Sequence, residues 1–280
     1  MVLRLLSAST LICAAVAAAP TPVSFWTFQE PAGSPRVSSG LYSYTLTDGD
    51  PANPVERQSG GLFGEYAAYF PAASPDQRLR ANRSSVSALT VDIAGTSAVV
   101  SLVAWIKRTN ASAPFSSGFL AGVWGDTGIE ARQYAMYFNL GMCYSSPVYH
   151  EGFAAHVSPT GGPTPGHQYC VTGACDPRSL AGDDWHCVTH TYDGQFIRAY
   201  VNATLASNGA YNPFPLTGGI YSPEAFGKPG AEFGVGVSMA FGYNQYQGLL
   251  GGLAVFNATL SSDEVAEVCA WPQRMRLSHA

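Results

Sequence analysis

The sequence predicts an all-β protein, a two-sheet antiparallel sandwich or jelly roll that ends in a short helix. Three observations predict it. Several short segments alternate apolar and polar residues, as strands with one buried face do. The 280 residues include 30 Gly and 19 Pro, which suit tight turns. Apolar residues make up 46% and charged residues 12%, so the chain can bury a large core.

The clearest predicted strand covers residues 99–108. Val100 and Leu102 fall on one face of it, and Val103 and Trp105 fall on the other. The remaining expected strands cover residues 23–28, 41–47, 118–124, 133–140, 185–191, 196–202 and 248–256.

Turn and cap signals complete the pattern. Asp193-Gly194 between two strands is a strong hairpin signal. Ser261 and Glu264 form a capping box that predicts the start of the terminal helix. Residues 29–61 and 143–184 show little periodicity, so we expect mostly loop there. Loops as long as the second one are often functional.

The N-terminus has the form of a secretory signal. Residues 1–4 are basic, residues 5–16 are largely apolar, and small residues at 17–19 suit cleavage before Pro20 or Thr21. A membrane anchor is the alternative, but the run is short for a bilayer and no later stretch is long enough. We therefore expect a secreted, extracellular protein with a signal peptide at 1–19 and a single domain at 20–280.

Glycosylation motifs and cysteines agree with export. Four Asn-x-Ser/Thr motifs predict glycosylation at Asn82, Asn110, Asn202 and Asn257. Five cysteines lie beyond the signal, which predicts two disulfides and one free thiol. Fifteen pairings are open, and the Gly/Pro-rich surroundings favour Cys170 with Cys175.

The charge balance excludes some partners. The formal net charge is −5 and there is no run of Lys or Arg. Nucleic acids and anionic membranes attract basic surfaces, so we expect neither as a partner.

Several phrases resemble laminin-G-like domains. Trp185-His-Cys-Val-Thr-His-Thr-Tyr-Asp-Gly194 is similar to the signature hairpin of that family, and Ala199-Tyr-Val-Asn202 to the strand that follows it. Further matches, in the family's order, lie at residues 103–107, 120–126, 251–256 and 260–264. The resemblance covers roughly residues 63–270.

This resemblance implies the concanavalin A-like lectin/glucanase fold. Relatives bind sugars or proteins, often with calcium, and some distant ones cleave polysaccharides, so the fold alone does not choose a function. The chain departs from the family at Gly252-Leu253, where an acidic pair is usual, and at Cys187, where His is frequent. The closing strand therefore lacks the carboxylates on which a calcium role there would rest.

The candidate ligand site combines aromatic and planar polar side chains, which suit a sugar's apolar face and its hydroxyls. The alternative is that Trp124 and Tyr134 belong to the core and that Arg132 is a surface charge. The candidate ligand-binding residues are Trp124, Asp126, Arg132, Gln133, Tyr134, His156 and Tyr169.

Calcium is the one candidate cofactor, with Asp126 of Gly125-Asp126-Thr127-Gly128 as its ligand. The alternative is that Asp126 only forms a turn. His186 and His190 share a strand face, but at about 13 Å apart they cannot share one metal ion.

No catalytic residues are predicted. The fold's glucanases carry Glu-x-Asp-x-x-Glu on one strand, and this chain has no such run. We expect a secreted, carbohydrate-binding, lectin-like protein without catalysis, whose partner is an extracellular glycan or polysaccharide. One alternative is a polysaccharide hydrolase or lyase that uses Arg132, His156 and Tyr169. The other is an extracellular adhesion module with a protein ligand.

Overall fold

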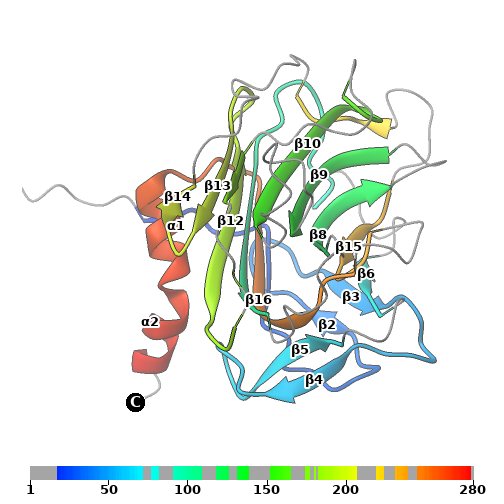
Figure 1. The fold of residues 1–280 in the computed structure, drawn as a ribbon, viewed down its shortest axis with the longest axis vertical. Coiled ribbons are helices and arrows are strands. Elements are labelled where there is room, and N and C mark those ends of the chain that lie inside the picture. Colours follow the sequence, from blue (N-terminus) through cyan, green and yellow to red (C-terminus); the bar gives the residue numbers. More distant parts are fainter. Residues whose placement is uncertain are drawn as a thin grey trace, which may run out of the picture.

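Two antiparallel sheets face each other in a computed structural model of the chain (Figure 1). The structure describes residues 18–71, 77–81, 91–108, 118–125, 131–138, 152–164, 174–176, 180, 182–206, 219–223, 231–238 and 245–278.

The first sheet brings together strands from both ends of the chain. Its order is β14 (Thr204–Leu205), β13 (Ile197–Val201), β12 (His186–Tyr192), β7 (Val100–Lys107), β16 (Gly248–Phe256), β5 (Tyr66–Phe70) and β4 (Glu56–Ser59), and β1 (Ser24–Trp26) also pairs with β16. Because β16 pairs with β1, β5 and β7, the closing strand joins early and middle segments of the chain.

The second sheet lies opposite. Its order is β11 (Ala174–Asp176), β10 (Phe153–Gly161), β9 (Ala131–Phe138), β8 (Gly118–Gly125), β15 (Phe233–Val235), β6 (Leu79–Ala81), β3 (Thr45–Asp48) and β2 (Arg36–Val37). The two-sheet sandwich predicted from alternation is confirmed.

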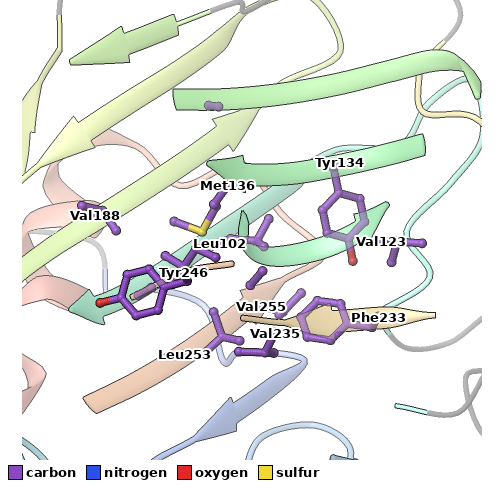
Figure 2. Close-up of a cluster of buried hydrophobic side chains, with 14 of the residues drawn as sticks. Leu102, Val123, Tyr134, Met136, Val188, Phe233, Val235, Tyr246, Leu253 and Val255 are labelled. Atoms are coloured by element: carbon purple, nitrogen blue, oxygen red, sulfur yellow. The ribbon is translucent and has the colours of Figure 1, made fainter. Parts of the chain in front are cut away.

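The core fills the space between the sheets. In β7, Val100 and Leu102 face this interior, as the alternation predicted. Figure 2 shows Leu102 with Met136 of β9 and Leu253 of β16, so both sheets contribute to one apolar cluster. Burial of these side chains is the main force that closes the sandwich.

Two helices, α1 (Ser262–Cys269) and α2 (Trp271–Ser278), lie beside the first sheet (Figure 1). The Ser261–Glu264 capping box is confirmed at the start of α1. Trp105 and Phe25 stand on the outer face of this sheet and pack in one cluster with Trp271.

A disulfide fixes α1 to the sheet. It joins Cys187 of β12 to Cys269, the last residue of α1, and closes a loop across a sequence separation of 82 residues. The helices are therefore held against the outer face of the first sheet by both packing and a covalent bond.

Three expectations are corrected. The predicted loop at residues 143–184 contains β10 and β11, and the one at 29–61 contains β2 and β4 in addition to β3, which overlaps the strand predicted at 41–47. In β10, small and polar residues mask the alternation of buried Phe153, Ala155 and Val157. The single predicted helix is followed by α2, whose mostly exposed residues have no apolar period.

Within the described residues, no helix is long and apolar enough to cross a membrane.

Candidate functional site

Three of the predicted ligand residues meet on the outer face of the second sheet. Trp124 of β8 and His156 of β10 have ring centroids 6.0 Å apart. The guanidinium carbon of Arg132, on β9, lies 5.7 Å from the centroid of the Trp124 ring. Tyr137 of β9 joins them, with its ring 5.8 Å from Trp124 and 5.5 Å from His156. We call Trp124, Arg132, Tyr137 and His156 the aromatic cluster.

The aromatic cluster is buried. Trp124 is 4% exposed, Arg132 9% and His156 2%. Burial, with the positive charge of Arg132, lowers the pKa of His156 to about 3, so its imidazole is neutral at pH 7. These side chains have the chemistry predicted for a sugar site, but a ligand cannot reach them in this conformation. Their role in binding stays a prediction.

The other predicted ligand residues do not join this cluster. Tyr134 points into the core between the sheets and donates a hydrogen bond to the Val91 carbonyl. Gln133 is fully buried, and its Nε2 donates to Asp92 Oδ1 and to the Tyr221 carbonyl, each at 2.9 Å. Asp126 and Tyr169 lie outside the described residues.

Metal binding is not supported by any cluster on the described strands and helices. Among those residues no group of three or more His, Cys, Asp or Glu side chains could hold an ion. The predicted calcium ligand, Asp126, is not among them, so calcium binding at that residue stays a prediction.

An open pocket lies on the opposite side of the molecule, between the first sheet and the two helices. Its volume is about 520 Å³, and we call it the helix pocket. Its described lining is Leu62, Trp105, Trp185, His186, Cys187, Asn202, Ala203, Ala266, Cys269, Ala270, Pro272, Gln273 and Arg276. The Cys187–Cys269 disulfide therefore ties the strand and helix parts of the lining together.

Trp185 supplies an aromatic surface to this pocket. Its ring lies on the backbone of β16, since a Cβ added at Gly251 would approach Trp185 to 2.9 Å. Leu62 comes within 3.2 Å of the same position. Glycine at 251 thus makes room for both side chains. Trp185 is half-buried, so part of its surface is open to solvent.

His186 and Asn202 form the polar rim of the helix pocket. Asn202 Oδ1 accepts a hydrogen bond from the Cys187 amide at 2.9 Å, and Asn202 Nδ2 lies 3.1 Å from His186 Nδ1. Asn202 and Ala203 have φ of 50° and 62°, as in a type I′ hairpin turn between β13 and β14. The turn therefore presents the exposed Asn202 at the mouth of the pocket.

Gln273 and Arg276 project from α2, and both are exposed. Arg276 Nη2 lies 3.5 Å from the Leu62 carbonyl oxygen. The guanidinium group therefore reaches from α2 to the part of the pocket lining that Leu62 forms. An indole surface, an imidazole, two amides and a guanidinium thus surround one space. These groups can stack on an apolar face and donate to or accept from hydroxyls. Among the described lining residues there is no carboxylate.

The sequence pattern does not predict the helix pocket as a site. Trp185 stands out there only as part of a hairpin, His186 only as a metal ligand that is rejected, and Asn202 only as part of a strand and a glycosylation motif. The sequence gives no signal for Arg276, because its place at the pocket depends on α2 folding back onto the sheet.

The modification predictions fall partly on described residues. Asn202 and Asn257 are both exposed, as an acceptor must be, while Asn82 and Asn110 lie outside the described residues. Cys175 is disulfide-bonded. Its predicted partner, Cys170, lies outside the described residues, so that pairing and all four glycosylation sites stay predictions.

Comparison with known families identifies the fold. The model of the concanavalin A-like lectin/glucanases superfamily, a laminin-G type, matches residues 81–266. The chain belongs to this superfamily. No curated protein sequence matches the chain.

Similar solved structures are binding domains of botulinum neurotoxins. One is the type DC binding domain in complex with rat synaptotagmin II, at 8% identity and a TM-score of 0.55; the alignment covers 90% of this chain and 52% of that one. Another is the serotype C1 binding domain, at 8% identity and a TM-score of 0.56, with the same coverage. The chain spans about half the length of these structures, and the similarity shows the fold alone.

A third similar structure is from botulinum neurotoxin type C, whose cell entry depends on interaction with two ganglioside molecules. Its identity is 9% and its TM-score 0.54, with 91% of this chain and 51% of that chain covered.

Local packing accounts for the glycine in the departure at Gly252-Leu253. A Cβ at Gly252 would lie 2.6 Å from the Phe63 ring and 3.1 Å from Trp105. Aromatic side chains cover the backbone at the position where relatives usually have a carboxylate. The outer face of β16 is therefore apolar in this chain.

Proposed function

We propose that the protein is a secreted, lectin-like carbohydrate-binding module without catalysis, and that it binds an extracellular glycan in the helix pocket. The observation that supports the proposal is the lining of this pocket. A half-exposed indole, Trp185, lies with His186, Asn202, Gln273 and Arg276 around a space of about 520 Å³. Aromatic stacking with planar hydrogen-bonding groups is a common way to hold a sugar ring.

The fold supports a binding role in general. The chain has the fold of concanavalin A-like binding domains. One similar toxin interacts with gangliosides, and gangliosides are lipids that carry sugars. Glycoside hydrolysis commonly uses two carboxyl groups, and the described lining of the helix pocket has none. A hydrolase that uses such a pair therefore has no specific support from the described lining of this pocket.

A glycan array with the secreted protein tests the proposal. We expect binding to a defined set of glycans that Trp185→Ala weakens at least about tenfold, or about 1.4 kcal/mol. Leu277→Ala is the matched control, because Leu277 is 79% exposed on α2 and does not line the pocket. If no glycan binds, with or without calcium, or if the Trp185 variant binds normally, the proposal is wrong.

A protein ligand is the second candidate. One similar toxin domain forms a complex with synaptotagmin II, a protein. An apolar groove beside α2 that includes Phe25, Trp271 and Met275 is the surface that favours this alternative. A pull-down with enzymatically deglycosylated extracellular proteins distinguishes the two: partner capture without glycans, reduced by Met275→Ser, would support adhesion.

A further inference from the structure

The N-terminal end of the described chain makes a specific contact with α1. The backbone nitrogen of Ala19 donates to Glu267 Oε2 at 2.8 Å, across 248 residues of sequence. Ala19 also packs against the outer cluster that contains Phe25 and Trp105. Its neighbour, Ala18, is exposed. The contact with the domain is therefore made at Ala19 and not at the residue before it.

Glu267 is well placed to hold a positive charge. Its side chain is only 17% exposed, and its other oxygen, Oε1, pairs with Arg274 at 3.1 Å. It lies two residues before Cys269, whose disulfide to Cys187 holds α1 against the sheet. The carboxylate is thus partly desolvated and held in one place, which strengthens its interaction with a cation.

A free α-amino group at Ala19 would suit this carboxylate better than an amide does. An α-amino group is largely protonated near neutral pH and offers three donors with a full charge. The carboxylate is ionised in both cases, so both hydrogen bonds are charge-assisted, but only the ammonium group adds the attraction of a full opposite charge.

We propose that the leader is removed between Ala18 and Ala19, one bond before the first position expected from the sequence, and that the new α-ammonium group of Ala19 binds Glu267. The inference rests on the proposed export. In the step, the exporting cell's signal peptidase breaks the Ala18–Ala19 C–N bond with one water molecule. The hydroxyl goes to the Ala18 carbonyl, which becomes a carboxylate. The Ala19 nitrogen receives the protons and becomes the ammonium group.

The local sequence fits this cut. Signal peptidases favour small residues one and three positions before the cleaved bond; alanine stands at the first of these, Ala18, and a short apolar residue at the second, Val16. A cut one bond later would fall before Pro20, whose nitrogen carries no hydrogen and whose ring restricts the preceding residue. It would also discard Ala19 and its contact with Glu267. Cleavage before Ala19 keeps the whole contact.

Intact-mass and N-terminal sequence analysis of the protein secreted by a eukaryotic host tests the cleavage. We expect Ala19 as the first residue. A secreted protein that begins at Pro20, Thr21 or any other residue overturns this inference and leaves export intact. Retention in the cell with residues 1–18 attached overturns both. The two failures are therefore distinguishable.

Thermal unfolding of chains that start at Ala19 or at Pro20 tests the ion pair. We expect the Ala19 form to melt about 2 °C higher, a shift typical of about 1 kcal/mol in a chain of this size. In the Glu267→Gln background the difference should shrink to the part that comes from the packing of Ala19 against the outer cluster. Glu65→Gln, at an exposed carboxylate on another part of the chain, is the matched control and should keep the full difference. An equal difference in all three backgrounds would show that Glu267 does not bind the terminus.

Discussion

The outer faces of the two sheets carry similar residue types in opposite settings. On the second sheet, Trp124, Arg132 and His156 lie together but are at most 9% exposed. On the first sheet, Trp185 and His186 are half-buried beside the exposed Asn202, around an open pocket. An aromatic ring with polar partners stabilises the fold in one place and is available to a ligand in the other. The two roles differ in how far the side chains are exposed to solvent, and the residue types alone do not reveal this exposure.

The largest expected effect concerns the two tryptophans of these faces. Trp124→Ala should lower the free energy of unfolding by about 3–5 kcal/mol, because it removes a buried ring from the aromatic cluster. Trp185→Ala should cost much less, since its ring is half-exposed. Urea denaturation of both variants checks this. Equal losses would mean that the two faces do not differ as described.

The disulfide gives the next largest effect. Replacing Cys187 and Cys269 together with serine should destabilise the fold by about 2–4 kcal/mol, because the unfolded chain regains the freedom of a long loop. It should also weaken glycan binding, since both cysteines line the helix pocket. Denaturation and glycan titration measure the two losses. Leu277→Ala is the control for general damage near the helices. Unchanged glycan affinity in the serine variant would contradict the assignment of the pocket.

Lowering the pH should destabilise the fold through two buried histidines, His190 and His156 of the aromatic cluster. Burial lowers the pKa of His190 to about 3, with a smaller contribution from repulsion between the protonated forms of His190 and His156, and burial with the charge of Arg132 does the same for His156. As pH falls from 6.5 towards 3, the unfolded chain binds protons that the folded chain does not. Stability should therefore drop by about 1.4 kcal/mol per pH unit for each histidine.

Denaturation at pH 7 and pH 5 measures this loss. His190→Leu should remove about half of it, whereas His186→Gln, at the rim of the helix pocket, should leave it in place. A flat stability between pH 7 and pH 5 would show that the two buried rings can take up protons in the folded state.

The smallest expected effect concerns glycosylation at the pocket mouth. If the expressing cell glycosylates Asn202, the attached sugar stands beside Trp185 and competes with a free glycan. Thr204→Ala removes the motif without changing Asn202, and should raise glycan affinity a few-fold, which is under about 1 kcal/mol. Thr259→Ala removes the Asn257 motif as a control and should have no effect on affinity. A lower affinity in Thr204→Ala would mean that the attached sugar assists binding.

Much of the fold could be predicted from the sequence. The range 248–256 coincides with β16, the hairpin around Asp193-Gly194 is formed by β12 and β13, and the capping box starts α1. These elements have strong local signals: alternation, a turn dipeptide and a cap. The strand β10 was missed because alanine and polar residues hide its period.

The candidate site could be predicted only in part. Trp124, Arg132 and His156 do converge, because their strands are neighbours and the residues share one face. Their burial could not be foreseen from residue type. The helix pocket depends on Leu62, Trp185 and Arg276, which are distant in sequence and meet only after α2 folds back. No local sequence pattern predicts that these three residues line one pocket.

The indole N–H signals in a nitrogen–proton NMR spectrum test the central claim most directly. The protein has five tryptophans, so each signal can be assigned by single substitution. When a glycan from the array is titrated in, the Trp185 signal should shift with ligand concentration while the Trp124 signal stays in place. A shift of Trp124 with an unmoved Trp185 would place the ligand at the aromatic cluster and contradict the account.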